Sequence, residues 1–374
     1  MARNSSLAFI DDVTLYTMQP AAPVSEVERL GIIMDAELSD PTEAWGVLNP
    51  AIARGRDGEL YLFARVVAEG NYSRIRMARV LFDDAGRPAG LERLGFALEP
   101  SEPYELRGHG EGGCEDPRIT FIPTLDCYVM TYTGYGPHGA RVAIALSRDL
   151  FTWERLGVVD FGEQHGIDFD AFDNKDAFFF PEPVVAPDGT LSFACMHRPM
   201  TGHGSTSLHL ADLPSSIWVS YVPVAEAIND PSRLLHLRQH RLVLTPEYPW
   251  EQVKVGGGPP PVLTDEGWLL FHHGIEDLAG PEEPRKLRYA AGAFVVDRCD
   301  VTQILWRSPE PIMIPDTDME LSGIVNNVVF PTGIDVVNDS TVDLYYGMAD
   351  ARIGVARVAL QQDYLSREGA TQAA

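Results

Sequence analysis

A strand-forming unit that recurs five times constrains the fold of this 374-residue chain more than any other feature. Each unit opens where a proline enters an apolar run. These prolines stand at positions 50, 117, 183, 260 and 331, which are 67, 66, 77 and 71 residues apart. A repeat of this length indicates an architecture assembled from similar supersecondary units, each of which needs its neighbours to bury its apolar face.

Within each unit, a turn follows the opening run, and two further strands complete the pattern. Asp57-Gly58 and Asp188-Gly189 form two of the turns, and Asp-Gly is a strong hairpin signal. The second strands end in polar residues and are expected at 61–65, 128–132, 191–198, 268–273 and 344–350. The only helical turn that the pattern predicts lies at 224–228.

We therefore predict an all-β fold, and five small sheets close most simply as a five-bladed β-propeller. An array of β-sandwiches fits less well, because the period is long and regular. Residues 1–45 are expected to form an N-terminal lead-in, residues 46–362 the propeller and residues 363–374 a C-terminal tail. In a propeller, corresponding strand ends face one central funnel, so the polar residues that end the second strands should converge there.

Charge and cysteine content limit the functions open to the chain. The formal net charge is −25, and such a surface repels nucleic acid and anionic membranes. The four cysteines form no CxxC pair, and no Cys/His spacing suggests a metal site. The N-terminus lacks the apolar run of a signal peptide, and no stretch approaches the ~18 apolar residues of a membrane span. We expect a cytoplasmic protein with no bound metal.

One short stretch, Gly112-Gly113-Cys114-Glu115-Asp116-Pro117-Arg118, concentrates reactive side chains at the mouth of an expected strand. It places two carboxylates and a guanidinium within four residues, beside a proline that fixes the backbone. The two glycines allow a ligand to approach the main chain closely. Such a cluster on a rigid scaffold is typical of a functional site, although an Asp–Arg ion pair that only holds a loop is the structural alternative.

Charged residues of other units fall at places that a propeller would bring to the same funnel. These residues are Arg65, Arg198 and His273 at second-strand ends, Asp116 and Arg118, the pair Lys175-Asp176 before the third blade, Lys254 before three glycines, and Asp350 at the end of the last second strand. Cationic donors hold phosphates or carboxylates, whereas carboxylates bind sugar hydroxyls or transfer protons. Taken singly, each has a structural alternative: a surface cation, a solvated lysine or a buried core histidine. Their shared position in the repeat favours a common site.

At these residues the sequence resembles glycoside hydrolase family 130, which contains mannoside phosphorylases and related β-mannosidases. The resemblance runs from Asn49 to Asp350. The motifs that carry it are Gly113-Cys114-Glu115-Asp116-Pro117-Arg118, Asn174-Lys175-Asp176-Ala177, His197-Arg198-Pro199, Lys254-Val255-Gly256-Gly257-Gly258, His272-His273-Gly274, Asn327-Val328-Val329-Phe330-Pro331 and Tyr346-Gly347-Met348-Ala349-Asp350. The resemblance implies a five-bladed propeller, in agreement with the repeat.

The resemblance also implies a role for each candidate residue. Asp116 would be the general acid of an inverting reaction, acting through a sugar hydroxyl, and inorganic phosphate would be the nucleophile, so no second catalytic carboxylate is required. Phosphate would bind to Arg65, Arg198, Lys254, His273 and Tyr289. The sugar would bind to Asn49, Arg118, Lys175, Asp176 and Asp350. No cofactor is implied beyond inorganic phosphate as co-substrate.

We therefore expect a β-mannoside phosphorylase that cleaves a β-mannosyl di- or oligosaccharide to give α-mannose 1-phosphate. A β-mannosidase is the first alternative, with Asp176 or Glu320 as the base that activates water. A sugar-binding propeller without catalysis is the second. The sequence leaves open the glycosidic linkage, the acceptor sugar and the oligomeric state, although a homo-oligomer is compatible with such a family.

Overall fold

A computed structural model describes residues 22–108, 111–201, 213–280, 282–361 and 364–365. Its regular structure is almost entirely β, and the prediction of an all-β fold is confirmed. The described residues contain two α-helices of one turn each, α1 (Val224–Ala227) and α2 (Asp318–Leu321). The first was predicted from the sequence and the second was not. Most of the expected C-terminal tail, and residues 1–21 of the lead-in, lie outside the described residues.

The strands form antiparallel groups that follow one another along the chain. Group one comprises β2 (Gly46–Arg54), β3 (Leu60–Ala68), β4 (Tyr72–Phe82) and β5 (Pro88–Leu98). Group two comprises β6 (Gly112–Ile122), β7 (Cys127–Gly136), β8 (Gly139–Ser147) and β9 (Glu154–Val158). These two groups join in one eight-stranded sheet through a short parallel pairing of β4 with β6, at Tyr72–Gly112 and Ser73–Gly113.

The remaining strands form three further groups and one small ribbon. Group three comprises β12 (Asn174–Phe179), β13 (Val184–Val185), β14 (Leu191–Pro199), β15 (Ile217–Pro223) and β16 (Arg238–Leu244). Group four comprises β17 (Lys254–Gly257), β18 (Val262–Leu263), β19 (Trp268–Asp277), β20 (Leu287–Val296) and β21 (Ile304–Arg307). Group five comprises β22 (Val329–Asn338), β23 (Thr341–Met348), β24 (Arg352–Leu360) and β1 (Val24–Met34). The ribbon pairs β10 (Glu163–Gln164) with β11 (Ile167–Asp168).

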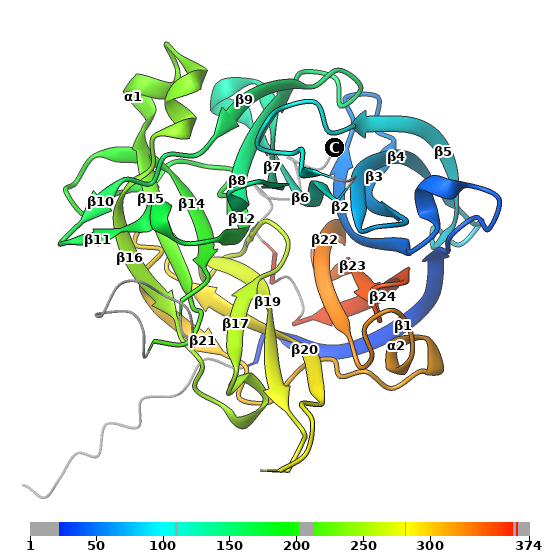
Figure 1. Ribbon diagram of the computed structural model, residues 1–374. Helices are drawn as coiled ribbons and strands as arrows, with labels where there is room; N and C mark the ends of the chain where they lie inside the picture. The colour runs from blue at the N-terminus through cyan, green and yellow to red at the C-terminus, as the bar shows by residue number, and fades with distance from the viewer. Residues whose placement is uncertain (1–21, 109–110, 202–212, 281, 362–363, 366–374) are drawn as a thin grey trace, which may run out of the picture.

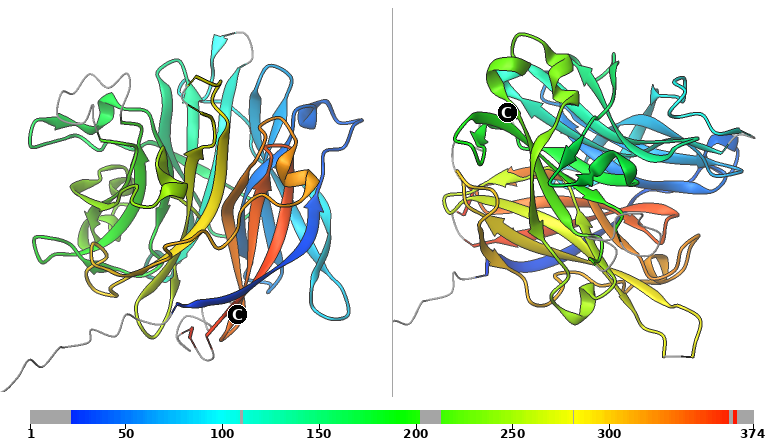
Figure 2. Two further views of the ribbon diagram at one scale, coloured as in Figure 1. Left: turned by 90° about the horizontal axis from the view of Figure 1, so that it is seen from below. Right: turned by 60° about the vertical axis from the view of Figure 1, so that its left-hand side comes forward.

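The N-terminal strand β1 closes the circuit by pairing with the last strand, β24. Figure 1 shows the groups succeeding one another around the molecule from blue to red, and in Figure 2 the dark-blue β1 lies along the orange and red C-terminal strands. The first strand of group one, β2, also contacts both β6 and β22. The sequence did not predict β1, because Val-Ser-Glu-Val-Glu-Arg-Leu lacks clean alternation and its partner strand is more than 300 residues away.

The third unit begins earlier than its proline indicated. The sequence placed the opening strand at Pro183 and Lys175-Asp176 before it, whereas the structure places both residues inside β12. The run at Pro183 forms only the two-residue strand β13, which extends the same edge of β14. Prolines at 181 and 183 have no N–H to donate, so they interrupt the ladder between the two segments.

Five clusters of buried apolar side chains stabilise the circuit, and each lies between two neighbouring groups. Phe63 of group one, for example, packs in one cluster with Met130 of group two. Alternate residues of one strand serve different clusters: Leu344 faces group four and Tyr345 faces group one. Because the cluster between groups five and one completes the series, every group buries both faces.

Four glutamates are fully buried, and each lies in the turn that precedes the innermost strand of its group. Each pairs with an arginine on the outermost strand of the same group. The pairs are Glu43 with Arg93, Glu105 with Arg155, Glu251 with Arg307, and Glu320 with Arg29. Each carboxylate also accepts hydrogen bonds from backbone N–H groups of its own turn. These contacts satisfy a buried charge from two sides and hold the chain where it enters the centre.

The ion pair Arg29–Glu320 allows a prediction of how much the attachment of β1 to the last strand group contributes to stability. Arg29 donates from Nε to Glu320 at 2.8 Å, and removing it by Arg29→Ala leaves a buried carboxylate with only Tyr346 and two backbone donors. We expect the free energy of unfolding to fall by about 2 kcal/mol. Arg87→Ala is the matched control, because Arg87 pairs with Glu28 of the same strand at an exposed site, where a loss below ~0.5 kcal/mol is expected. Equal urea midpoints for the two variants would contradict this role.

Candidate functional site

Of the site residues that the family resemblance implies, all except Arg118 line one cavity of about 220 Å³ at the centre of the strand groups. Ten predicted residues meet there, from groups one to five, as the convergence of strand ends required. Three apolar residues that the sequence analysis did not select complete the wall: Met200, Val325 and Phe330. Phe330 stands in one of the motifs that carry the family resemblance, but Met200 and Val325 had no signal in the sequence, because an apolar side chain at a strand end is compatible with either core or surface.

A bulge repeated in three innermost strands turns the key side chains into the cavity. Asn49, Asp116 and Asp176 have φ angles of 46°, 49° and 55°, and each lies within an irregularity in the pairing of β2, β6 or β12. Among residues with a Cβ, Asn and Asp tolerate this left-handed region best. A bulge re-aims a side chain that regular pleating would point elsewhere. The same kind of bulge therefore directs one amide and two carboxylates, from three strand groups, into the cavity.

Second strands supply the donors. Leu48 and Lys175, each next to a bulge, pair with Arg65 and Arg198, whereas Gly256 of the regularly paired strand β17 pairs with His273. A Cβ atom at Gly256 would collide with the His273 ring and with the Asp176 carboxylate. The glycine run after Lys254 is thus required for the approach of groups three and four.

Asp116 lies in a buried network on one side of the cavity. Its Oδ1 accepts from Asn49 Nδ2 at 2.9 Å and from Arg65 Nη1 at 3.2 Å. Burial raises the pKa of Asp116, but the charges of Arg65 and Lys175 outweigh it and hold the pKa below its usual range. The carboxylate is therefore ionised at neutral pH beside these cations. Within the described residues its Oδ2 makes no hydrogen bond.

Glu115 is the site residue that the sequence analysis gave no role. It is 2 % exposed and accepts from Arg65 Nη2 at 2.8 Å and from Lys175 Nζ at 2.9 Å. It thereby fixes one cation from group one and one from group three beside Asp116. Its position next to Asp116 in the motif was the available signal, but only the bulge makes both neighbours face the centre.

The other side of the cavity holds donors that are not fully paired. Asp176 accepts from Arg198 Nε at 2.6 Å, and the Arg198 and Arg118 guanidinium groups hold the pKa of Asp176 below its usual range despite burial. Nη1 of Arg198 is buried and makes no hydrogen bond within the described residues. No ion pair or hydrogen bond of the Lys254 ammonium occurs among the described residues either. Two free donors beside a tied carboxylate form a site for an oxyanion.

The chemistry of this side depends on burial. Burial and the nearby Arg198 lower the pKa of Lys254 to about 8. Burial also lowers the pKa of His273 well below its usual range, so the imidazole is neutral and acts as a hydrogen-bonding group. The His273, Tyr289 and Phe330 rings form one cluster, in which the His273 centroid lies 6.4 Å from that of Tyr289 and 4.3 Å from that of Phe330. The chain has only three lysines, and two of them, Lys175 and Lys254, line the cavity.

Arg118 lies behind the cavity wall and connects groups two and four. It is 1 % exposed, donates from Nε to the Gly258 carbonyl at 2.7 Å and from Nη1 to the Asp116 carbonyl at 3.0 Å. The structural alternative, a side-chain pair with Asp116, does not occur, since Arg118 bonds to the backbone of that residue. Arg118 thus holds the bulge that carries Asp116 against the glycine run.

Of the two candidate bases for hydrolysis, only one lines the cavity. Glu320 does not line the cavity, because Arg29, Tyr346 and the backbone of its own turn bind its carboxylate; its assignment as a base is wrong. Asp176 lines the cavity, but the short bond to Arg198 and its lowered pKa make it a weak base.

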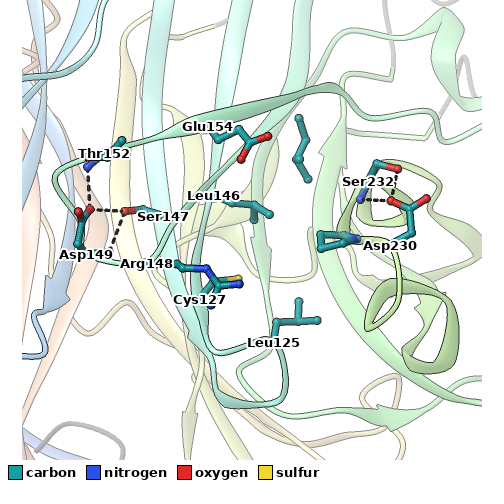
Figure 3. A pocket seen from close by; sticks show the side chains of 12 residues that line it. Leu125, Cys127, Leu146, Ser147, Arg148, Asp149, Thr152, Glu154, Asp230 and Ser232 are labelled. Atoms are coloured by element: carbon teal, nitrogen blue, oxygen red, sulfur yellow. Dashed lines mark hydrogen bonds between the residues drawn. The ribbon is translucent and has the colours of Figure 1, made fainter.

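A larger cavity of about 570 Å³ lies between groups two and three, away from these residues. Figure 3 shows Asp149 and Asp230 on opposite sides of this cavity, each turned to its own loop, with Glu154 as a third acidic residue of the lining. Asp149 accepts from Ser147 Oγ and from the Thr152 N–H, while Asp230 accepts from Ser232. Because these polar groups already cap turns, the cavity offers no convergent set of free donors and acceptors.

Comparison with known proteins identifies the relatives of this chain. A family model for glycoside hydrolase family 130, described as beta-1,4-mannooligosaccharide phosphorylase, matches residues 19–362. A 1,2-beta-oligomannan phosphorylase of Thermoanaerobacter sp. is 33% identical over 65% of this chain and 67% of its own length. A beta-1,2-mannobiose phosphorylase of the same organism is 32% identical over 65% and 66%. The alignments thus span about two thirds of the curated relatives' length.

The structural comparison supports the same fold. The solved structure of the beta-1,2-mannobiose phosphorylase from Listeria innocua, in complex with beta-1,2-mannobiose, superposes with a TM-score of 0.66 and 24% sequence identity. The superposition covers 90% of this chain and 97% of that one. No helix in the part of the chain described by the structure is long and apolar enough to cross a membrane.

The shifted pKa of Lys254 predicts how anion binding depends on pH. Lys254 loses its charge as the pH rises through about 8, so the dissociation constant of inorganic phosphate should increase by up to about tenfold per pH unit above that value. Lys254→Arg should remove the increase, because arginine stays charged. Isothermal titration calorimetry between pH 7 and 9 measures both. Lys286→Arg is the control, since Lys286 does not line the cavity; a wild-type affinity that is constant to pH 9 would contradict the assignment.

Proposed function

The chain belongs to glycoside hydrolase family 130, and we propose that it is an inverting β-mannoside phosphorylase. The observation that carries the proposal is the division of one cavity into a carboxylate side, with Asp116, and a side with free cationic donors. Phosphorolysis needs both: an acid for the leaving oxygen, and a binding site for phosphate on the opposite face of the sugar. The products are α-mannose 1-phosphate and the shortened sugar.

In this proposal Asp116 protonates the leaving group, acting through a sugar hydroxyl. Phosphate binds to Arg198, Lys254, His273 and Tyr289, and also to Arg65, whose guanidinium holds Asp116. The mannosyl unit is bound by Asn49, Lys175, Asp176 and Asp350, while Arg118 holds the backbone beneath it. Protein cations neutralise the phosphate, so the reaction has no step that requires a metal or organic cofactor.

Phosphate is favoured over water as the nucleophile by the state of the carboxylates. An inverting hydrolase needs a second, basic carboxylate that positions water. Asp176 is tied to Arg198 at 2.6 Å, and its lowered pKa weakens it as a base. The free Nη1 of Arg198 and the unpaired Lys254 instead match the oxygens of a dianion.

The relatives' names indicate the linkage to test first. Two Thermoanaerobacter proteins and one from Listeria innocua are named for β-1,2-linked mannosides. A protein of Ruminococcus albus, 34% identical over a shorter stretch, is named for β-1,4-mannooligosaccharides. We therefore propose a β-1,2-linked mannobiose or oligomannan as substrate, with mannose or a mannooligosaccharide as acceptor.

We also propose that the five strand groups are the blades of a five-bladed propeller, with residues 46–362 as the catalytic domain and β1 completing the last blade. The five inter-group clusters and the β1–β24 pairing support this arrangement. The cytoplasmic location and the homo-oligomeric state stay predictions from the sequence.

The reverse reaction tests the function and names the acceptor together. The protein is mixed with α-mannose 1-phosphate and with mannose, glucose or N-acetylglucosamine, and released phosphate is measured. We expect release with mannose. If none of the three acceptors gives phosphate release, and free mannose is released from β-mannosides in the absence of phosphate, phosphorolysis would be overturned.

The role of Asp116 predicts a separation of turnover from binding. Asp116→Asn removes the transferable proton while keeping a side chain that fits beside Asn49 and Arg65. We expect kcat to fall by about 10³-fold, with phosphate affinity within about threefold of wild type. Asp126→Asn, at an exposed turn, is the matched control and should keep full turnover. An Asp116→Asn enzyme with more than a tenth of wild-type kcat would exclude Asp116 as the acid.

A further inference from the structure

Asp116 presents a difficulty for the proposed reaction, since a general acid must carry a proton and the surrounding cations keep Asp116 ionised. Arg65 and Asn49 bind its Oδ1, and neighbouring cations hold its pKa below the usual range. The proton must therefore arrive when the ligands bind. The structure contains one group suited to receive it first.

Asp350 is the cavity carboxylate that no donor holds. Glu115 accepts from two cations, Asp176 from Arg198, and Asp116 from Asn49 and Arg65. Asp350, in contrast, makes no hydrogen bond or ion pair within the described residues, although it lines the same cavity. Its backbone is in the left-handed region, with φ at 52°, so the chain turns at this point to direct it inward.

The surroundings of Asp350 disfavour its charge. Burial raises its pKa to about 6, and the carboxylates Asp116 and Glu115 of β6 add to the effect. Arg65 of β3 and Lys175 of β12 oppose it but do not outweigh it. The remaining titratable group that faces it is the Tyr289 hydroxyl of β20. Asp350 is thus close to accepting a proton at neutral pH.

The net charge of the site determines how phosphate binding changes the protonation of its carboxylates. Five cationic side chains surround or support the cavity, against four carboxylates. The cations are Arg65, Arg118, Lys175, Arg198 and Lys254, and the carboxylates are Glu115, Asp116, Asp176 and Asp350. Binding of a phosphate dianion changes this excess of one positive charge into an excess of one negative charge. Uptake of one proton by a carboxylate offsets the change.

We propose that Asp350 is the proton-holding partner of Asp116, and that the binding of inorganic phosphate loads this pair of carboxylates with one proton. The proposal rests on the proposed function. It gives Asp350 a part in the reaction beyond contact with the sugar. Phosphate binding then protonates the carboxylate pair before the glycosidic bond is broken. Without phosphate, the nucleophile, the site therefore lacks a protonated general acid.

The protons of the reaction balance if Asp116 and Asp350 donate one proton and take one back. The bond from C1 of the mannosyl unit to the leaving oxygen breaks, and that oxygen takes a proton from a sugar hydroxyl, which takes the proton of Asp116 in turn. A phosphate oxygen forms the new bond to C1, and HPO₄²⁻ loses its own proton as it becomes the ester dianion. That proton returns to the Asp116–Asp350 pair, so no other acid or base is consumed.

Calorimetry of phosphate binding at pH 7, in two buffers of different ionisation enthalpy, tests the proposal. The difference in heat gives the number of protons taken up per phosphate bound. We expect wild type to take up between about half and one proton more than Asp350→Asn, which has no carboxylate to load. The comparison between variants cancels the ionisation of phosphate itself and of Lys254.

Each further result decides a separate point. Asp350→Asn mimics the protonated form, so it should bind phosphate at least as tightly as wild type, with an affinity that varies less between pH 6 and 7.5. Asp335→Asn is the matched control: Asp335 also has a pKa raised by burial, but it pairs with Arg54 away from the cavity, and its variant should keep wild-type proton uptake. Equal uptake in wild type and Asp350→Asn, or loss of phosphate binding in that variant, would overturn the inference alone. Absence of phosphate binding to wild type would instead overturn the proposed function.

Discussion

A left-handed bulge in the innermost strand of three neighbouring strand groups sets the geometry on which the rest of the site depends. It turns Asn49, Asp116 and Asp176 toward one centre and leaves the opposite positions to Arg65 and Arg198. Regular pleating would alternate these side chains between two apolar inter-group cores. The bulges thus create a polar interior where five hydrophobic clusters would otherwise meet.

The second constraint is electrostatic. The protein carries a net charge of −25, yet its central cavity gathers lysine and arginine side chains around a few carboxylates. Removal from water makes each missing partner costly, and this explains why most of these groups are paired. Arg198 keeps one free nitrogen, and Asp350 has no donor. These departures from full pairing are the places where ligand atoms are expected to bind.

The sequence predicted the repeat, the strands and most of the site, because turn residues and alternation are local signals. It failed where the determinant is not local. Strand β1 pairs with residues more than 300 positions away, so its pattern alone did not identify it. Strict alternation places Asp116 and Arg118 on one side, but the irregularity in β6 turns Arg118 toward Gly258. Glu320 was an acidic residue near a motif, and only the three-dimensional contacts to Arg29 and Tyr346 show that it holds the fold.

The most direct test of the account is the forward reaction on β-1,2-mannobiose, followed by proton and phosphorus NMR with and without inorganic phosphate. The account predicts α-mannose 1-phosphate and mannose in equal amounts when phosphate is present, and no cleavage when it is absent. Release of mannose at a similar rate without phosphate would contradict it, because the free donors around Arg198 and Lys254 would then have no part in the chemistry.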